Sequence, residues 1–475
     1  MSTPPGANAL PDTRVVIVGG GPGGYEAALV ARRLGADVTV VEEKGLGGSA
    51  VLTDVVPSKT LIATAEWMTI ADRAPELGIR SGLSQDHGHH IDLAAVNTRV
   101  KALAAAQSAD IRGRLEKEGV HVVLGRGRLD GPQRVVVDLV DGGGETTLDA
   151  DVVLVATGAR PRELPEARPD GERILTWTQL YDLPALPEKL VVVGSGVTGA
   201  EFAGAYTSLG ADVTLVSSRD RVLPGEDGDA AELIEQVFKQ RGMTVLSRSR
   251  AAGARRTADG VVVTLADGRE VAGTHVLFAV GSIPTTSGLG LEESGVRLSP
   301  SGHIEVDKVS RTSVRGVYAA GDVTGVLPLA SVAATQGRIA MSHALGDTVM
   351  PLSLRAVAAN IFTAPEIATV GYSEQRLQDE GLAYEVSSLP LTRNPRAKML
   401  GVREGFVKIF ATPGAGTVLG AVLVGPRASE SVFPLALAIT HRLSVDQVAQ
   451  VITVYPSMSG TLAEVARTLH HRAAD

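Results

Sequence analysis

The chain has 475 residues, of which 44% are hydrophobic and 21% charged, a composition typical of a globular protein with about two to four domains. Its 45 Lys and Arg against 53 Asp and Glu give a formal charge of −8, which argues against nucleic-acid binding because phosphate backbones require clustered basic residues. It contains no cysteine, so disulfide scaffolds and thiolate metal sites are excluded.

The N-terminal residues 1–12 are polar and rich in proline, without the basic and apolar segments of a signal peptide. No apolar stretch approaches the ~20 residues that are needed to cross a bilayer. We therefore expect a cytoplasmic protein without a membrane span. His87, His89 and His90 lie in a polar stretch that lacks a second spaced pair of ligands, so no metal site is predicted.

The first predicted unit is a strand over residues 15–18, a glycine-rich turn and a helix that continues to Leu34. The turn has the pattern Gly-x-Gly-x-x-Gly, at Gly19, Gly21 and Gly24. Between a strand and a helix, these glycines permit a tight turn, close approach of a pyrophosphate and close helix packing. The next strand ends at Glu42 and Glu43, where a carboxylate can accept hydrogen bonds from ribose hydroxyls. This unit predicts a dinucleotide site.

Several further segments follow the first unit. Residues 47–59 read Gly-Gly-Ser-Ala-Val-Leu-Thr-Asp-Val-Val-Pro-Ser-Lys. Residues 58–118 are rich in alanine with helical periodicity, which predicts a helical insert in the first domain. Residues 151–160 predict a buried strand that runs into an Ala-Thr-Gly turn, and residues 316–324 predict another that ends in Gly321 and Asp322.

A second copy of the glycine-rich unit lies 175 residues after the first. Gly194 follows Gly19 by this offset, and Gly199 follows Gly24 by the same offset. The second motif comprises Gly194, Gly196 and Gly199, between another apolar strand and another helix. Two copies in register predict two dinucleotide-binding domains, since a single chance match would not repeat with its flanking elements.

The two copies differ where they would contact the ribose. The offset places Ser217, Ser218 and Arg219 on the positions of Glu42, Glu43 and Lys44. Two hydroxyls and a guanidinium suit a 2′-phosphate, which a carboxylate would repel. The first copy therefore suits a ribose without a 2′-phosphate, and the second favours NADPH, with NADH as an additional donor. The alternative for Arg219 is a solvated arginine in a loop.

The C-terminal region has a different pattern. From Ser353 onward, alternating strands such as residues 406–410 and 418–424 are followed by helical patterns. The predicted fold class is therefore α/β, with two Rossmann-like dinucleotide-binding domains and a C-terminal α+β domain.

In their order and spacing, these motifs resemble the flavin-dependent pyridine nucleotide-disulfide oxidoreductases, which include lipoamide dehydrogenase, glutathione reductase and mercuric reductase. The resemblance extends from Arg14 to about Arg467. It implies FAD in the first site, a nicotinamide nucleotide in the second, and a homodimer formed through the C-terminal domain. It also implies three domains. The FAD-binding domain consists of residues 1–160 and 290–352, the NAD(P)-binding domain of residues 161–289, and the dimerisation domain of residues 353–475.

The redox-active disulfide of that family is missing. The family carries Gly-Gly-Thr-Cys-x-Asn-x-Gly-Cys-x-Pro-Ser-Lys where this chain has residues 47–59, so Ala50 and Val55 occupy the two cysteine positions. Thiol–disulfide exchange requires one thiolate to attack and another to leave. The chain supplies neither, so its reaction cannot be the usual one of the family.

A second part of the disulfide machinery is also missing. The family has His-Pro-Thr-x-x-Glu near its C-terminus, where His is the acid/base for the thiol and Glu orients it. Here Tyr455 stands at the histidine and Gly460 at the glutamate. Tyr455 either donates a proton at the open face of the flavin or packs there, and the sequence leaves both roles open.

Two charged residues of the family are retained. The resemblance implies that Lys59 lies beside the flavin ring and pairs with Glu201, which follows the second glycine-rich loop. A cation at this place stabilises the negative charge of reduced flavin, a task that does not depend on sulfur. A purely structural ion pair is the alternative.

The resemblance also assigns the remaining contacts of the two cofactors. In addition to the glycine motifs and the residues at the ends of the second strands, it implies that cofactors are contacted by Gly48, Ser49, Lys59, Ala156, Thr157, Gly158, Gly281, Asp322 and Ala330.

The resulting hypothesis is a homodimeric, FAD-containing NAD(P)H oxidoreductase that reduces quinones or similar small acceptors. It resembles the cysteine-less NAD(P)H:quinone reductase branch of the family. One alternative is a soluble pyridine nucleotide transhydrogenase, which moves hydride between NADPH and NAD⁺. Another is a redox-inactive FAD-binding scaffold, which is disfavoured because both glycine-rich loops, Lys59 and Glu201 are intact.

Overall fold

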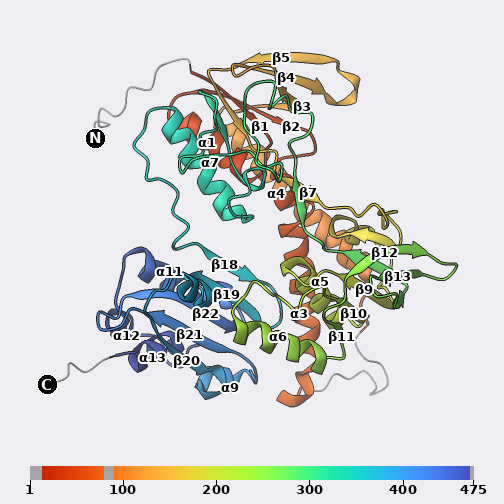
Figure 1. Cartoon of the computed structure of the whole chain (residues 1–475), viewed down its shortest axis with the longest axis vertical. Helices are drawn as coiled ribbons and strands as arrows, with labels where there is room; N and C mark the ends of the chain where they lie inside the picture. The colour runs from red at the N-terminus through yellow and green to blue at the C-terminus, as the bar shows by residue number, and fades with distance from the viewer. Residues whose placement is uncertain (1–12, 80–89, 471–475) are drawn as a thin grey trace. The chain divides into compact units, whose positions relative to one another are not determined.

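The computed structural model describes residues 13–79 and 90–470 of the chain (Figure 1). These residues form two compact units that are each made of several chain segments. Among the described residues, the first unit comprises residues 13–60, Ala94–Arg162 and Gly281–Leu352, and the second comprises residues 61–79, 90–93, Glu163–Val280 and 353–470. Both contain parallel sheets with helices between their strands, so the expected α/β fold class is confirmed.

A seven-stranded sheet forms the centre of the first unit, in the order β17-β6-β1-β2-β3-β4-β5. Its strands are β1 (Arg14–Val18), β2 (Asp37–Glu42), β3 (His121–Leu129), β4 (Arg134–Leu139), β5 (Glu145–Asp149), β6 (Val152–Val155) and β17 (Val317–Ala319). The strands from β17 to β3 pair in parallel, whereas β3, β4 and β5 form an antiparallel meander. The parallel strands bring their carboxyl ends to one edge of the sheet, where such folds bind nucleotides.

Small residues allow the helices of the first unit to pack closely. These helices are α1 (Pro22–Arg33), α2 (Gly48–Leu52), the start of α3 (Val55–Asp72), α4 (Leu93–Lys117) and α7 (Ala330–Ala344). Helices α1 and α7 lie against each other (Figure 1), and a Cβ atom on Gly337 would stand 2.0 Å from the carbonyl oxygen of Gly23. Ala27, Ala28 and Ala31 bury the inner face of α1. A short antiparallel pair, β7 (Ala159–Pro161) with β16 (Ser282–Pro284), completes this unit.

The second unit contains a five-stranded parallel sheet in the order β11-β10-β9-β15-β8. Its strands are β8 (Ile174–Thr176), β9 (Lys189–Val193), β10 (Asp212–Val216), β11 (Thr244–Leu246) and β15 (His275–Phe278), and its main helices are α5 (Val197–Leu209) and α6 (Gly228–Gln240). An antiparallel sheet accompanies it, formed by β12 (Ala251–Arg256), β13 (Val261–Leu265) and β14 (Glu270–Gly273).

An antiparallel sheet in the order β18-β19-β22-β21-β20 forms the C-terminal part of the second unit. Its strands are β18 (Ala358–Ile361), β19 (Glu366–Gly371), β20 (Glu385–Pro390), β21 (Phe406–Ala411) and β22 (Val418–Gly425), and its helices are α8 (Glu374–Asp379), α9 (Pro395–Met399), α10 (Ala428–Ser431), α11 (Phe433–Thr440), α12 (Val445–Ala449) and α13 (Gly460–Thr468). The strands expected over residues 406–410 and 418–424 are present as β21 and β22, and every residue of both is buried.

Short 3-10 helices connect several of these elements, at η1 (Ala74–Leu77), η2 (Val140–Gly142), η3 (Trp177–Asp182), η4 (Asp322–Thr324) and η5 (Leu391–Arg393). Within residues 13–79 and 90–470, no helix combines the length and apolar character needed to span a bilayer. In the same part of the chain, His, Asp and Glu form no group of three or more that could hold a metal ion. His87 and His89 lie outside the described residues, whereas His90 lies within them.

Candidate cofactor sites and active site

The three glycines of the first loop have three different surroundings. Gly19 has a φ of +106°, and a Cβ atom there would stand 2.3 Å from the carbonyl oxygen of Ala156. A Cβ on Gly24 would stand 1.9 Å from the carbonyl oxygen of Gly19, so only glycine permits this approach of helix to strand. At Gly21, apart from its neighbours in sequence, no described atom lies within 4 Å of the Cβ position. The loop is thus closed around its first and third glycines and open at the second, where a pyrophosphate would approach.

Glu42 is held firmly beside this loop at the end of β2. Its carboxylate is buried and accepts the Gly20 N–H at 2.6 Å through Oε2 and the Lys44 N–H at 2.8 Å through Oε1. Oε1 also accepts the Gly45 N–H at 3.3 Å, so the second acceptor position of Oε2 is the one that can take a hydrogen bond from a ribose hydroxyl. Glu43, the adjacent candidate, is exposed to solvent.

The segment that replaces the redox-active disulfide lies against the same loop. The Gly47 N–H donates to the carbonyl oxygen of Gly20 at 2.8 Å, and a Cβ on Gly48 would stand 2.9 Å from the Cα of Gly21. Helix α2 starts at Gly48 and carries Ser49 and Ala50, whereas α3 starts at Val55. Ala50 is half-buried and Val55 is 37% exposed, so both sulfur positions now present apolar atoms at an accessible surface. Lys59 is partly buried near the start of α3.

The other predicted contacts of the first site lie at the ends of β6 and β17. Ala156, Thr157 and Gly158 follow β6, and the Thr157 hydroxyl donates to the carbonyl oxygen of Thr285 at 2.7 Å. Asp322 begins η4 directly after Gly321, which lies two residues beyond the end of β17. Burial raises the pKa of the Asp322 carboxyl, and the charge of nearby His303 opposes this effect.

A buried glutamine that sequence analysis missed holds the turn at Asp322. Gln336 lies on α7, which starts at Ala330, and its Oε1 accepts the Gly321 N–H at 2.9 Å. Its Nε2 donates to the Thr324 hydroxyl at 3.3 Å, so Gln336 bridges both ends of the turn. The signal was a single amide within the small residues of α7, where a buried polar side chain requires a partner.

The second glycine-rich loop repeats the geometry of the first. Gly194 has a φ of +112°, and its Cβ position is 2.2 Å from the carbonyl oxygen of Ala279. The Cβ position of Gly199 is 1.8 Å from the carbonyl oxygen of Gly194. At Gly196, again leaving out its neighbours in sequence, the described residues place no atom within 4 Å. Gly281 has a φ of +92° and lies in the connection between β15 and β16.

Ser217, Ser218 and Arg219 follow β10, but their side chains differ in exposure. Ser217 is fully buried, and its hydroxyl lies 2.6 Å from that of Ser195 in the glycine-rich loop. The Ser217 Oγ also accepts the Arg219 N–H at 3.1 Å, so this hydroxyl shapes the loop. Ser218 and Arg219 are exposed to solvent at the end of the strand. A contact of Ser217 with a 2′-phosphate stays a prediction.

Glu201 is held by a second part of the chain. It lies on α5 with only 3% of its surface exposed, and its Oε1 accepts the Phe362 N–H at 2.8 Å. Phe362 directly follows β18 in the C-terminal part of the same unit. A backbone donor of this kind leaves no recognisable pattern in the sequence. The pairing of Glu201 with Lys59 stays a prediction from the resemblance.

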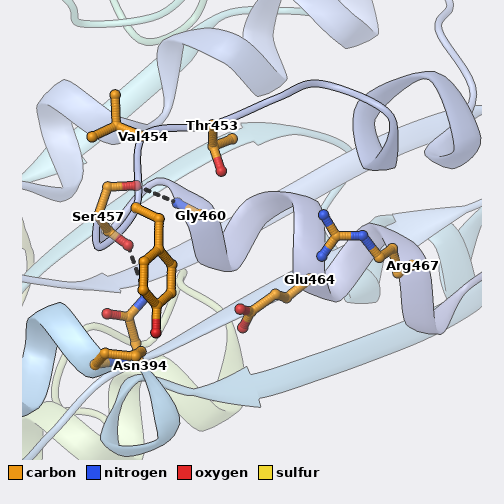
Figure 2. Close-up of a pocket in the computed structure, with 9 residues that line it drawn as sticks. Asn394, Thr453, Val454, Ser457, Gly460, Glu464 and Arg467 are labelled. Atoms are coloured by element: carbon orange, nitrogen blue, oxygen red, sulfur yellow. Dashed lines mark hydrogen bonds between the residues drawn. The ribbon is translucent and has the colours of Figure 1, made fainter.

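Tyr455 lines a polar pocket of about 140 Å³ in the C-terminal region (Figure 2). The pocket is lined by Asn394, Pro395, Thr453, Val454, Tyr455, Ser457, Gly460, Glu464 and Arg467. Glu464 and Arg467 project from the same side of α13 (Figure 2), and sequence analysis assigned a role to neither of them. The Tyr455 side chain is 80% exposed.

Asn394 holds the loop that carries Tyr455. Its Nδ2 donates to the Ser457 carbonyl oxygen at 2.9 Å and to the Thr461 hydroxyl at 2.8 Å. Its Oδ1 accepts the backbone N–H groups of Arg396 and Ala397, which caps α9. These contacts give Asn394 a structural role in the turn at residues 394–398.

Comparison with known proteins agrees with the fold. The profile described as "Pyridine nucleotide-disulphide oxidoreductase" matches residues 13–337, and that of the "dimerisation domain" of the same family matches residues 357–466. A Mycobacterium tuberculosis (strain H37Rv) protein named NAD(P)H dehydrogenase (quinone) is 53% identical over 465 residues, which cover 96% of this chain and 94% of the relative. The dihydrolipoyl dehydrogenase of Geobacillus stearothermophilus is 33% identical over 458 residues, 96% of each chain.

Solved structures give the same result. The crystal structure of LpdA from Mycobacterium tuberculosis is similar with a TM-score of 0.92 and 53% identity, covering 97% of this chain and 100% of that chain. The flavoprotein disulfide reductase RclA from Escherichia coli has a TM-score of 0.85 and covers 96% of this chain and 99% of its own. At 23% identity, RclA supports the fold alone.

Proposed function

This chain belongs to the pyridine nucleotide-disulphide oxidoreductase family, and we propose that it is an FAD-dependent NAD(P)H:quinone oxidoreductase that works without a redox-active disulfide. One observation carries this proposal. Both glycine-rich loops keep the geometry of a dinucleotide cradle, whereas Ala50 and Val55 stand at the two sulfur positions. The two loops support binding of cofactors, and a chain without cysteine cannot carry out disulfide chemistry. The relative named NAD(P)H dehydrogenase (quinone) supports the same reaction.

The residues of the first site fit FAD. The open space at Gly21 suits the pyrophosphate, and Glu42 suits the ribose of the adenosine half. The partly buried Asp322 suits the ribityl hydroxyls, and Thr157 and Gly158 lie in the turn assigned to the flavin by the family resemblance. When bound, FAD supplies the hydride and electron chemistry, and the protein supplies its position and electrostatics.

The second site is proposed for NADPH, with NADH as an additional donor. Gly196 provides the open position for the pyrophosphate, and the exposed Ser218 and Arg219 lie at the end of β10, where the 2′-phosphate would bind. Glu201 is fixed by the Phe362 N–H and is proposed to pair with Lys59. We place the enzyme in the cytoplasm, in keeping with its cysteine-free sequence.

We propose a homodimer formed through the C-terminal domain, and Tyr455 completes the acceptor site from the partner subunit. Large apolar side chains are exposed in this region: Phe433 by 64%, Ile452 by 98% and Val454 by 78%. A surface of this kind is typical of a subunit interface. Together with Ala50 and Val55, it would form an apolar cleft that suits a flat, weakly polar quinone. A Tyr455→Phe variant separates proton donation by Tyr455 from simple packing.

Turnover with NADPH against a panel of quinones, NAD⁺ and lipoamide tests the proposed function. We expect quinones to be reduced fastest and lipoamide not at all, because no thiolate is available. A faster reaction with NAD⁺ would favour the transhydrogenase, and the absence of turnover with every acceptor would favour the redox-inactive scaffold.

The purified protein is expected to be yellow, with about one FAD per chain, and to retain its activity after treatment with thiol-alkylating reagents. The first expectation follows from the complete first cradle, and the second from the absence of cysteine. The absorption spectrum, the released FAD and the activity before and after alkylation are the measurements. A colourless, folded protein that cannot be reconstituted with FAD would contradict the proposal.

Replacing Arg219 by Ala is expected to weaken NADPH binding far more than NADH binding. Only NADPH carries the phosphate that a guanidinium can bind, and a charge-assisted hydrogen bond is worth roughly 1.5–3 kcal/mol. The ratio of kcat/KM for NADPH to that for NADH should fall by about ten- to a hundredfold. An unchanged ratio would mean that Arg219 is a solvated loop residue.

A further inference from the structure

Two loops at the carboxyl ends of neighbouring strands are joined by backbone hydrogen bonds. The loop after β10 comprises residues 217–221, and the loop after β11 comprises residues 247–250. The Arg248 N–H donates to the Arg219 carbonyl oxygen at 2.9 Å, and the Ser249 N–H donates to the Ser217 carbonyl oxygen at 2.7 Å. The second loop is therefore fixed beside the residues that are proposed to bind the 2′ position.

The joined loops bring an acid and several arginines to one edge of the sheet. Arg248 Nε donates to Asp220 Oδ1 at 2.7 Å, with 80% of the Arg248 side chain and 77% of the Asp220 side chain exposed. The exposed residues Arg219, Arg221 and Arg250 belong to the same two loops. Exposed ion pairs contribute little to stability, so the Asp220–Arg248 pair can open with little effect on the fold.

The backbone at Arg248 points to a role for its side chain. Arg248 has a φ of +52°, a left-handed conformation that costs a non-glycine residue free energy and is usual for glycine or asparagine. The hydrogen bond to Arg219 holds the residue in this conformation. A loop that required only this backbone shape would be formed more favourably with glycine. The guanidinium, which is bonded to Asp220, is the feature that glycine would not supply.

In dinucleotide-binding folds, the ribose 2′ position is read at the end of the strand that follows the glycine-rich unit. An acid there accepts a hydrogen bond from the 2′-hydroxyl of NADH, whereas an arginine binds the 2′-phosphate of NADPH. This chain has both groups in the loop region after β10 and β11, and they are bonded to each other.

We propose that the Asp220–Arg248 pair is a cofactor selector that lets one site accept both NADPH and NADH. With NADPH, Arg248 leaves Asp220 and joins Arg219 on the 2′-phosphate. With NADH, Arg248 stays on one oxygen of Asp220, and the other oxygen accepts the 2′-hydroxyl. This inference rests on the proposed nicotinamide nucleotide site and extends it from one residue to a pair with opposite preferences.

The test measures binding of two adenosine probes to the full-length, FAD-loaded protein by calorimetry. Adenosine 2′,5′-bisphosphate carries the 2′-phosphate, and AMP carries the 2′-hydroxyl in its place. Arg248→Ala should weaken binding of the bisphosphate by about ten- to a hundredfold and should leave the affinity for AMP within about twofold of the wild-type value. Asp220→Asn should act in the opposite sense. It should tighten binding of the bisphosphate and weaken binding of AMP, each by about three- to tenfold.

A matched control comes from another exposed arginine pair of the same unit. Arg255 lies on β12 and contacts Glu270 at 3.4 Å, with 59% of its side chain exposed. Arg255→Ala should change the binding of neither probe. Arg248→Lys should retain a part of the bisphosphate affinity, because it keeps the charge but loses the planar guanidinium.

The possible results separate the selector from the proposed site itself. If Asp220→Asn changes the affinity for both probes in the same direction, or if Arg248→Ala leaves the affinity for the bisphosphate unchanged, the proposed selector is wrong although the site is real. If the wild-type protein binds neither adenosine bisphosphate nor intact NADPH, the nicotinamide nucleotide site is wrong, and the selector is overturned with it. Binding is measured without turnover, so the identity of the electron acceptor does not affect the result.

Discussion

Replacing Ala50 by Trp is expected to abolish quinone reduction while leaving the reduction of bound FAD by NADPH almost unchanged. Ala50 is half-buried on α2, at a position where the disulfide enzymes carry sulfur. An indole here would fill the space proposed for the acceptor. By analogy with the family, we place NADPH on the opposite face of the flavin. Displacement of an acceptor by about 1 Å can cost roughly a hundredfold in rate, and complete exclusion costs more.

The two half-reactions are measured separately by rapid mixing. NADPH should bleach the FAD absorbance of Ala50→Trp at close to the wild-type rate, and subsequent mixing with a quinone should restore the absorbance at least about a hundredfold more slowly. Ala50→Val is the matched control, because it adds only two methyl groups to the same apolar surface and should retain most of the quinone turnover.

Two results would contradict this mechanism. One is a parallel fall of both half-reactions in Ala50→Trp, and the other is direct competition between quinone and NADPH in the wild-type enzyme. Either result would mean that the acceptor uses the nicotinamide site. The cofactor loops would then keep their proposed roles, but Tyr455 would have no role in reduction of the acceptor.

The glycine-rich cradles could be predicted in detail because their information is local in sequence. Gly19 and Gly24, and again Gly194 and Gly199, are required by contacts with backbone atoms a few residues away or in the neighbouring strand. A side chain is sterically excluded at these positions in both copies, so the same spacing appears twice. The parallel strand order follows from the same repeated unit.

Other parts of the site could not be read from the sequence because their partners are distant. Gln336 closes the turn at Gly321, and a backbone N–H of Phe362 holds Glu201. Neither contact has a fixed spacing or a recognisable pattern. The same holds for the loop after β11, which contacts the loop after β10 only because the two strands are neighbours.

Lys408 is buried in a strand whose sequence pattern would place it in solvent. The residues of β21, Phe-Val-Lys-Ile-Phe-Ala, suggest one apolar face and one solvated face with lysine on it. In the structure the lysine is as buried as its neighbours. Its ammonium contacts Asp227 at the start of α6. The ammonium nitrogen also lies 5.7 Å from the ring centre of Phe406 and 6.0 Å from that of Phe410. A lysine within an apolar strand was the available signal for a buried ion pair.

Replacing Lys408 by Met is expected to lower the free energy of unfolding by about 3–5 kcal/mol. The Lys408 Nζ lies 3.0 and 2.9 Å from the two carboxylate oxygens of Asp227, whose side chain is 2% exposed. Without the ammonium, Asp227 would remain as an uncompensated buried charge. Lys239→Met is the matched control, because Lys239 pairs with Glu235 at 2.6 Å but is 54% exposed, and this pair should contribute less than about 1 kcal/mol.

The same pair predicts the dependence of stability on pH and a rescue variant. Burial opposes the charge of Lys408, but hydrogen bonds and charges of Asp229 and Asp227 outweigh it and raise the pKa of Lys408. The contribution of Lys408 to the free energy of unfolding should therefore be fully present below the unfolded pKa of about 10.4 and be lost as pH rises through the higher folded pKa.

Asp227 also accepts the backbone N–H groups of Asp229 and Ala230, so Asp227→Asn keeps a helix cap while removing the charge. In the Lys408→Met background it should restore more than half of the lost stability in urea denaturation. If the double variant is as unstable as Lys408→Met, the loss comes from side-chain packing at β21, and the buried carboxylate of Asp227 is not its cause.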